Sequence, residues 1–279
     1  NDIVFGKNNI KDIKKLVGEV DIFLGAYTGA GPYPQTYYKI SDPVLPLKAD
    51  IMKAKLAKRF LNTVDELGAR INIPFAGQYL LGGNLSKLND YRAVIDATDL
   101  IKERKNIFVL KQEGITNTTD KKPKKNQLRL ERYSKEEVSR YSEIISKKKF
   151  SYENLFRKKA VSSLPIKRLV SIAYQNAIKR SEYNDKFGYY LAINVNEEEY
   201  CVFNLSPQLN KGVKFLSMSD KRNIKKPYSI ITIDTRYLFG LLTHIYHWNN
   251  AEVGSMYRVD RNPDKFKPEV QNFLNFFTV

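Results

Sequence analysis

The stretch Asp21-Ile22-Phe23-Leu24-Gly25-Ala26-Tyr27 decides the expected fold, because a short apolar run of this kind is typical of a buried β-strand. A second run, Ile71-Asn72-Ile73-Pro74-Phe75, has the same character. Between them, apolar residues at helical spacing predict a helix that begins near Pro46 and stops at Gly68, and a shorter helix is expected over residues 10–17. The order helix, strand, helix, strand predicts a layered α/β unit.

Two loops follow these expected strands, and their composition suits the binding of a ligand. Residues 25–37 and residues 74–83 both combine glycine and proline with tyrosine and glutamine. Glycine lets the backbone approach a ligand, proline fixes the approach, and the other side chains offer ring faces and hydrogen bonds. Functional loops of α/β sheets lie at the carboxyl ends of strands. The same composition also suits tight connections, and no GxxxxGKS/T or GxGxxG motif supports a nucleotide phosphate loop.

The last third of the chain predicts an α+β module. Three apolar runs are expected to be strands, at residues 187–195, 200–205 and 229–234. A helix is expected over residues 237–246, and a closing helix presents one apolar face made of Phe266, Val270, Phe273, Leu274 and Phe277.

Residues 114–126 are rich in glycine, proline, asparagine, threonine and lysine, which predicts a mobile loop or linker. Ser134 and Glu137 then have the spacing of a capping box, and Pro165 is expected to open a further helix. The chain is therefore expected to have three parts, which are residues 1–113, a basic linker with helices over 114–180, and the α+β module over 181–279.

Positive charge is concentrated in the middle of the chain. The 279 residues include 47 Lys and Arg against 30 Asp and Glu, a formal charge of +17. Residues 1–100, 101–180 and 181–279 carry +2, +14 and +1. Such a stretch is often a solvated surface, and it also suits nucleic acid or another anionic partner. Because the charge is local, a nucleic-acid-binding protein is possible but not favoured.

The sequence contains no feature that calls for a membrane or an oxidising compartment. Cys201 is the single cysteine, so no disulfide can form within the chain. No apolar run approaches the roughly 18 residues that a membrane span needs. We therefore expect a soluble, cytoplasmic protein without a membrane span.

The two histidines and a nearby polar cluster are the remaining candidate features. His244 and His247 are expected on one helix, but zinc sites use three or four ligands and no HExxH motif is present. Close to them, Trp248, Arg258 and Arg261 lie in a polar and aromatic cluster that could bind an anionic sugar or phosphate. A capped turn with surface ion pairs explains this cluster equally well.

Several segments, taken in order, resemble a known family. Val20-Asp21-Ile22-Phe23-Leu24-Gly25-Ala26-Tyr27 is followed by Gly29-Ala30-Gly31-Pro32-Tyr33-Pro34-Gln35-Thr36-Tyr37 and then by Pro74-Phe75-Ala76-Gly77-Gln78-Tyr79. This order resembles the metallo-β-lactamase-fold proteins related to CMP-N-acetylneuraminate hydroxylase, over roughly the first 110 residues. Trp248-Asn249-Asn250 and Arg261-Asn262-Pro263-Asp264 are similar to the C-terminal end of bacterial members.

The resemblance implies an αββα sandwich whose metal site is founded on an HxHxDH motif. That motif is absent, so the chain is expected to be the C-terminal part of such a sandwich, followed by a basic helical region and the small α+β module. The expected partner is the missing N-terminal half or a complementary chain, and the opening Asn1-Asp2 fits a processed or truncated N-terminus. Asp2 is the one metal ligand that carries over. The full-length protein is expected to hold a divalent metal, Zn or Fe, and this chain alone none tightly.

The implied activity is that of a metal-dependent hydrolase or oxygenase acting on an anionic small molecule, such as a sugar nucleotide or a cell-surface sugar. A metal ion would make a bound water reactive by lowering its pKa. The side chains implied to line the substrate pocket are Tyr27, Tyr33, Gln35 and Gln78. Nothing in the chain could hold the iron–sulfur cluster of the hydroxylase. A basic nucleic-acid- or anion-binding module and a metal-free structural relative are the alternatives.

Overall fold

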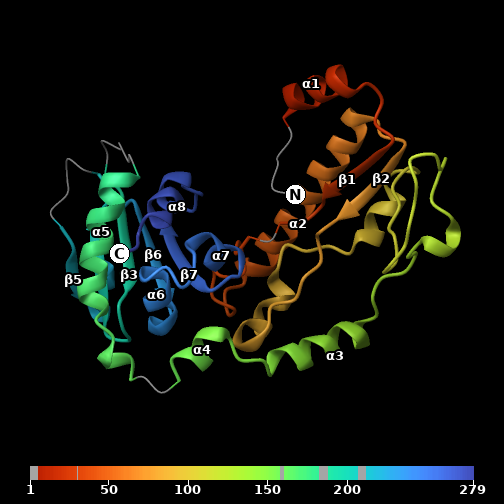
Figure 1. The fold of residues 1–279 in the computed structure, drawn as a ribbon. Helices are drawn as coiled ribbons and strands as arrows, with labels where there is room; N and C mark the ends of the chain where they lie inside the picture. The colour runs from red at the N-terminus through yellow and green to blue at the C-terminus, as the bar shows by residue number, and fades with distance from the viewer. Residues whose placement is uncertain (1–5, 30, 158–159, 182–187, 207–211) are drawn as a thin grey trace. The chain divides into compact units, whose positions relative to one another are not determined.

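The computed structural model of the chain describes residues 6–29, 31–157, 160–181, 188–206 and 212–279 (Figure 1). The chain divides into two compact units, and both mix helices with strands, which confirms the α/β and α+β class at this coarse level. No helix in the described ranges is long and apolar enough to cross a membrane. Unit 1 comprises Asn1–Pro34, Pro43–Gly82 and Ser86–Ser146, and unit 2 comprises Gln35–Asp42, Gly83–Leu85 and Lys147–Val279.

Unit 1 is built on a parallel pair of strands (Figure 1). Ile22 lies opposite Ile71, and Ala26 lies opposite Phe75. The predicted order helix, strand, helix, strand is confirmed. In chain order the elements are α1 (Lys7–Val17), β1 (Ile22–Ala26), α2 (Val44–Leu67), β2 (Ile71–Phe75), the 3-10 helices η1 (Gly83–Tyr91), η2 (Ala97–Lys102) and η3 (Lys125–Gln127), and α3 (Lys135–Ser146). The first three residues of η1 belong to unit 2.

Helix α2 packs against β1 through aromatic side chains. The buried rings of Phe23 and Phe60 stack with their centroids 6.0 Å apart. The helix ends at Gly68, whose left-handed backbone (φ 70°) lets its N–H donate to the Val64 carbonyl at 3.0 Å. The predicted helix stop at this glycine is therefore confirmed.

Strand β1 is the edge strand of this small sheet. On the other side of β2, the Asn72 N–H donates to the Asn106 carbonyl at 2.9 Å, and the Phe108 N–H donates to the Asn72 carbonyl at 2.9 Å. Residues 106–108 thus continue the sheet there. On the β1 side, β2 is the only strand that pairs with β1 within the described ranges. Leu24 and Phe75, on one face of the pair, are 55% and 52% exposed.

Unit 2 contains a five-stranded mixed sheet with the order β5-β4-β3-β6-β7 (Figure 1). Strands β3 and β6 are parallel, and the other neighbours are antiparallel. The elements are α4 (Ser151–Leu155), η4 (Val161–Ser163), α5 (Ile166–Arg180), β3 (Tyr190–Asn194), β4 (Glu199–Asn204), β5 (Lys214–Ser217), η6 (Met218–Asn223), β6 (Tyr228–Ile233), α6 (Thr235–Leu242), α7 (Trp248–Val253), β7 (Tyr257–Asn262) and α8 (Pro268–Asn275).

The core of unit 2 is an aromatic cluster between helices and one face of the sheet. Phe203 on β4 lies 4.9 Å from Tyr174 on α5, 5.5 Å from Phe273 on α8 and 5.3 Å from Phe277, measured between ring centroids. Helix α5 begins after Pro165, as predicted, and buries its apolar face in this cluster. Trp248 packs at the same cluster, 6.2 Å from Phe277.

One segment from the first part of the sequence belongs to unit 2. The Thr36 carbonyl accepts a hydrogen bond from the Val259 N–H on β7 at 3.0 Å. The Gln35 amide donates to Ser255 Oγ at 3.0 Å, and the Tyr38 hydroxyl donates to Asp264 at 2.5 Å. Residues 35–42 therefore pack as an addition to β7.

Three expectations differ from the structure in detail. The expected boundary at residue 113 lies inside unit 1, because the Lys111 N–H bonds to Gln127 O at 2.9 Å and the chain returns to the same unit. The helix expected over 237–246 ends at Leu242, so His244 lies in a turn and His247 is the residue just before α7. Strand β7, which contains Arg258 and Arg261, was not predicted.

We predict that Phe273→Ala lowers the free energy of unfolding of unit 2 by about 3–5 kcal/mol, because it leaves a cavity among fully buried rings. Urea unfolding followed by the fluorescence of Trp248 measures this, since the single tryptophan lies in the same core. Phe266→Ala is the matched control, because that ring is 59% exposed and its loss should cost less than about 1 kcal/mol. Equal effects of the two substitutions would contradict the assigned core.

Candidate functional site

The two loops at the carboxyl ends of β1 and β2 meet in unit 1. Thr28 Oγ1 donates to the Gly77 carbonyl at 2.5 Å. The ring of Tyr27 lies so close to Gly77 that a Cβ there would be 2.1 Å from a ring carbon. Ala76 just before it has a positive φ of 52°. Tyr27 therefore packs directly on the second loop, and only glycine fits at position 77 without a shift.

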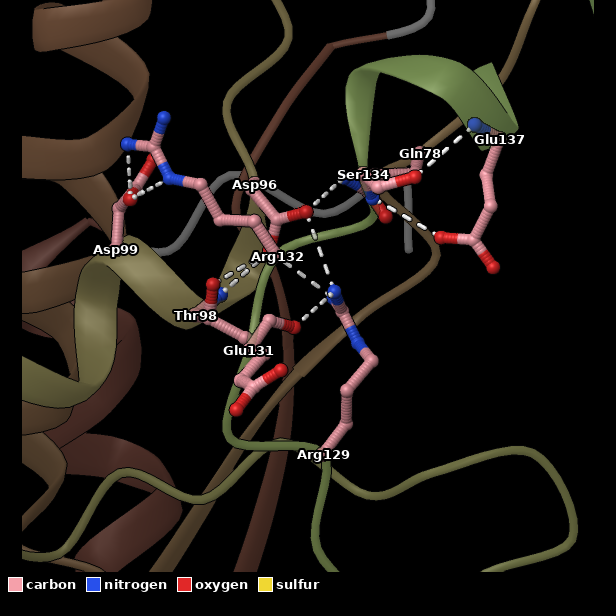
Figure 2. A network of polar contacts seen from close by, with 9 residues as sticks. All are labelled: Gln78, Asp96, Thr98, Asp99, Arg129, Glu131, Arg132, Ser134 and Glu137. Atoms are coloured by element: carbon pink, nitrogen blue, oxygen red, sulfur yellow. Dashed lines mark hydrogen bonds and ion pairs between the residues drawn. The ribbon is translucent and has the colours of Figure 1, made fainter. Parts of the chain in front are cut away.

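A carboxylate network holds the second of these loops in place (Figure 2). Asp96 accepts hydrogen bonds from Gln78 Nε2 at 2.9 Å, from Thr98 N at 2.9 Å and from Thr98 Oγ1 at 2.8 Å. Arg129 forms an ion pair with it at 3.1 Å, between side chains that are only 16% and 11% exposed. Gln78, which follows β2, thus bonds to Asp96 just before η2, and Asp96 in turn pairs with Arg129 after η3.

The electrostatics of this network favour an ionised Asp96 and a neutral Tyr27. Burial raises the pKa of Asp96, but the hydrogen bonds from Arg129, Thr98 and Gln78 outweigh burial and lower the pKa to about 2. Burial, with the negative charge of Asp96 as a smaller cause, raises the pKa of Tyr27 well above its ordinary value. At neutral pH the Tyr27 hydroxyl is therefore protonated.

The segment that follows Arg129 is fastened by further charged contacts. The Arg129 guanidinium lies 4.3 Å from the centre of the Tyr133 ring, and its Nη1 donates to the Glu131 carbonyl at 3.1 Å. Arg132 Nε donates to Asp99 at 2.7 Å. Figure 2 also shows the predicted capping box, in which Ser134 and Glu137 exchange hydrogen bonds of 3.0 and 3.1 Å.

The hydrogen bonds to Asp96 hold the surrounding polar side chains in fixed positions. Asp96 uses its oxygens on four donors, so it positions other groups and is poorly placed to act as a base or nucleophile. The Gln78 side chain is exposed and is fixed through its amino group, which leaves its carbonyl oxygen available to a ligand. The pairing of Asp96 with Arg129 could not be predicted from the sequence, because no local motif joins two residues so far apart.

The other residues expected at the pocket lie elsewhere. Tyr33 is partly buried in unit 1, whereas Gln35 is fully buried in unit 2, where it bonds to Ser255. Trp248 is 2% exposed and donates to the Phe277 carbonyl at 3.2 Å, so it acts as a core residue. Its expected role in substrate binding has no support from this position.

Arg258 and Arg261 lie on opposite faces of β7, because successive side chains of a strand alternate. Arg258 is exposed. Arg261 is 10% exposed, donates from Nε and Nη2 to Asp264 at 3.0 and 2.9 Å, and lies 4.3 Å from the centre of the Tyr37 ring. The structure therefore does not bring the two arginines together.

The metal-related predictions concern Asp2 and the histidine pair. Asp2 lies outside the described residues. The rings of His244 and His247 are 6.1 Å apart between centroids. Within the described part of the chain, no three His, Cys, Asp or Glu side chains are grouped so that they could hold a metal ion. These residues therefore do not by themselves fit the metal site that the family resemblance implies.

Comparison of the chain with known proteins assigns it neither a family nor a function. No protein-family model matches the sequence. Searches among curated proteins and among solved structures find no match either. The fold and the site thus define the class only as a two-unit α/β protein with a polar loop cluster at the carboxyl ends of parallel strands.

We predict that Asp96→Asn lowers the free energy of unfolding by about 2 kcal/mol at neutral pH, because it leaves Arg129 without its counter-charge. The folded pKa of about 2 lies below the ordinary value of 3.8. The stabilisation that ionised Asp96 gives the folded state is therefore fully present above the ordinary pKa. It is lost as the pH falls toward the folded pKa.

Urea unfolding followed by circular dichroism, at neutral pH and near pH 3, measures both effects. Asp65→Asn is the control, because Asp65 and its partner Arg104 are 47% and 41% exposed. It should change the free energy by less than about 1 kcal/mol. A difference between wild type and Asp96→Asn that stays constant down to low pH would rule out an ionised, bonded Asp96.

Proposed function

We propose that the chain is part of a metal-dependent hydrolase or oxygenase of the metallo-β-lactamase superfamily, and that its substrate is an anionic sugar or sugar nucleotide. The observation that carries the proposal is the meeting of residues 27–28 with residues 76–78 at the carboxyl ends of two parallel strands. These are the loops on which the family resemblance rests. Tyr33 and Gln78 are the unit 1 residues that we assign to substrate binding, whereas Tyr27, which is 3% exposed, packs in the core against the second loop.

The exposed face of the β1–β2 pair supports the proposal that unit 1 is one part of a larger sandwich. Parallel sheets are normally covered on both faces, and two strands alone are marginally stable. Leu24 and Phe75 nevertheless expose more than half of their surface, and β2 is the only strand that pairs with β1 among the described residues. We assign the covering strands to the missing N-terminal half or to a complementary chain.

This chain's own residues would bind and orient the substrate. The Gln78 carbonyl can accept a hydrogen bond, and the Asp96–Arg129 pair keeps Gln78 in place. Because the described residues do not form a metal site, we derive no chemical step through a metal. Asp2 remains the one ligand that we propose from this chain, and the others would come from the partner.

Metal analysis tests the proposal. We expect the full-length protein to contain stoichiometric Zn or Fe by elemental analysis and Asp2→Ala to lose it, because a missing ligand opens the site. The same substitution at Asp12, an exposed aspartate on α1, should change nothing. Unchanged metal content in Asp2→Ala would remove Asp2 from the site, and stoichiometric metal in this chain alone would contradict a site completed from outside.

A second candidate function rests on four lysines at and just before the start of η3. Lys121, Lys122, Lys124 and Lys125 are all exposed, and no ion pair or hydrogen bond involves their side chains in the described structure. Four unpaired lysines within five residues suit an anionic polymer such as single-stranded nucleic acid. Under this second candidate function, the chain is an anion-binding module and not part of an enzyme.

A salt titration separates the two candidates. If the lysines bind nucleic acid, the affinity for a short single-stranded oligonucleotide should fall roughly 50-fold between about 50 and about 200 mM salt, because each of four neutralised phosphates releases about 0.7 counterion. Replacing all four lysines by glutamine should remove that dependence, which fluorescence anisotropy measures. Binding that is absent, or that the glutamine variant retains, would exclude the second candidate.

A further inference from the structure

A partly open cavity of about 300 Å³ lies in unit 2, beside the turn that joins α6 to α7. Pockets that bind small molecules commonly have volumes of about 300–1,000 Å³, so a cavity at the lower end of that range suits a compact ligand. Six polar side chains line it, which are His244, His247, Asn249, Asn250, Asn275 and Thr278. All of them belong to unit 2, whereas residues 27–28 and 76–78 of the candidate functional site belong to unit 1.

The packing of unit 2 holds the two sides of this cavity together. The Val279 N–H donates to the Leu242 carbonyl at 2.8 Å, and Trp248 Nε1 donates to the Phe277 carbonyl at 3.2 Å. These bonds fix residues 275–278 beside the turn. The cavity is therefore preformed by the fold.

The turn itself is tightly constrained. His244 has a positive φ of 61°, a conformation that is uncommon for residues other than glycine. The ring of Tyr246 stacks on Tyr237 with the centroids 4.7 Å apart, and a Cβ at Gly240 would lie 2.4 Å from a carbon of the Tyr246 ring. This turn places the imidazoles of His244 and His247 next to each other, with their centroids 6.1 Å apart.

Most of the polar groups around the cavity are not used within the protein. In the part of the chain that the structure describes, no hydrogen bond or ion pair involves the side chains of His244, His247, Asn250, Asn275 and Thr278. Thr278 is the most enclosed of these, at 4% exposure. Asn249 Oδ1 accepts from Gln271 Nε2 at 3.0 Å, which fixes the Asn249 amide and leaves its amino group for a ligand. The cavity thus presents several hydrogen-bonding groups that have no partner inside the fold.

The lining selects against a charged ligand. None of the described residues around the cavity is Asp, Glu, Lys or Arg. Sites for phosphate, carboxylate or ammonium groups are normally built on side chains of the opposite charge. Amide and hydroxyl groups instead offer both donors and acceptors. The cavity therefore suits a neutral ligand that makes several hydrogen bonds.

The lining is also poorly suited to stacking a flat base. Trp248 is only 2% exposed, and one face of the Tyr246 ring is covered by Tyr237. The planes of the His244 and His247 rings lie at 73° to each other, so they cannot enclose a flat ring between them. Because proteins hold nucleobases largely by stacking, the geometry favours a ligand whose polar groups point in several directions.

We propose that this cavity of unit 2 binds a neutral polyhydroxylated small molecule of about the size of a monosaccharide. Hydroxyl groups of the ligand would donate to and accept from the side chains of His247, Asn250 and Asn275. The inference goes beyond the proposed function, because it adds a second binding site and uses no residue of the loops after β1 and β2. It holds whether or not the chain is part of an enzyme.

Saturation-transfer NMR of the ligand tests the site with the whole chain. The probes are D-glucose, D-galactose, D-mannose and N-acetyl-D-glucosamine, titrated in the presence of EDTA so that no divalent metal contributes. We expect saturable binding of at least one sugar, and saturable binding of none would overturn the proposal. Displacement of the bound sugar by equimolar inorganic phosphate, compared with chloride at equal ionic strength, would overturn the assignment to a neutral ligand.

Variants locate the bound sugar. Asn275→Ala should weaken binding about fivefold, the usual effect of losing one hydrogen bond, and the further change His247→Ala should weaken it about fivefold again. Both side chains are exposed and unbonded within the described structure, so these variants should keep the melting temperature of the wild type. Asn154→Ala is the matched control, because it removes an exposed, unbonded amide from α4 of the same unit. It should keep the full affinity.

Two results from these variants would contradict the proposed site. Equal affinity of the wild type and the double variant would show that the sugar does not bind in this cavity. Binding that Gln78→Ala removes while the unit 2 variants retain it would place the sugar at the loops of unit 1. That outcome would overturn this inference and support the proposed function.

Discussion

The parallel pairing of β1 with β2 is the constraint on which unit 1 depends. Because the strands run in the same direction and in register from Ile22 to Ala26, their carboxyl ends must lie together. The following loops therefore meet, and the ring of Tyr27 occupies the space that a side chain at Gly77 would need. Asp96 then needs to fix only one residue, Gln78, to hold the second loop. Without the pairing, Tyr27 and Thr28 would not lie against Gly77.

The parts of the fold that the sequence predicts well are those encoded by local pattern. Apolar runs located β1 and β2, a glycine marked the end of α2, and Pro165 marked the start of α5. Strand β7 escaped prediction because charged residues alternate with its buried ones, so its exposed side resembled a polar cluster. The site follows the same division. Composition singled out the two loops and the family resemblance implied Tyr27 and Gln78 within them, whereas the Asp96–Arg129 pair joins distant residues and carries no local signal.

The structure also changes what the net charge of +17 means. Arg104, Arg129 and Arg132 fall in the basic middle of the sequence, yet each is paired with an aspartate from the preceding part of the chain. The charges of these arginines are therefore already matched by aspartates within unit 1. The lysines of residues 121–125 have no such partners. Counting charges along the sequence cannot separate these two groups, because the difference lies in which aspartates fold next to them.

The addition of residues 35–42 to β7 has a consequence for how the protein can be dissected. The chain passes from unit 1 to unit 2 and back before α2 begins, and it does so again around residues 83–85. A single cut therefore cannot release either unit whole. A fragment that starts at Lys147 would lack the segment whose Thr36 carbonyl bonds to β7, and Gln35 would no longer fill its place beside Ser255. Each unit would have to be isolated as a redesigned chain, with the short segment from residues 35–42 supplied or replaced by a linker.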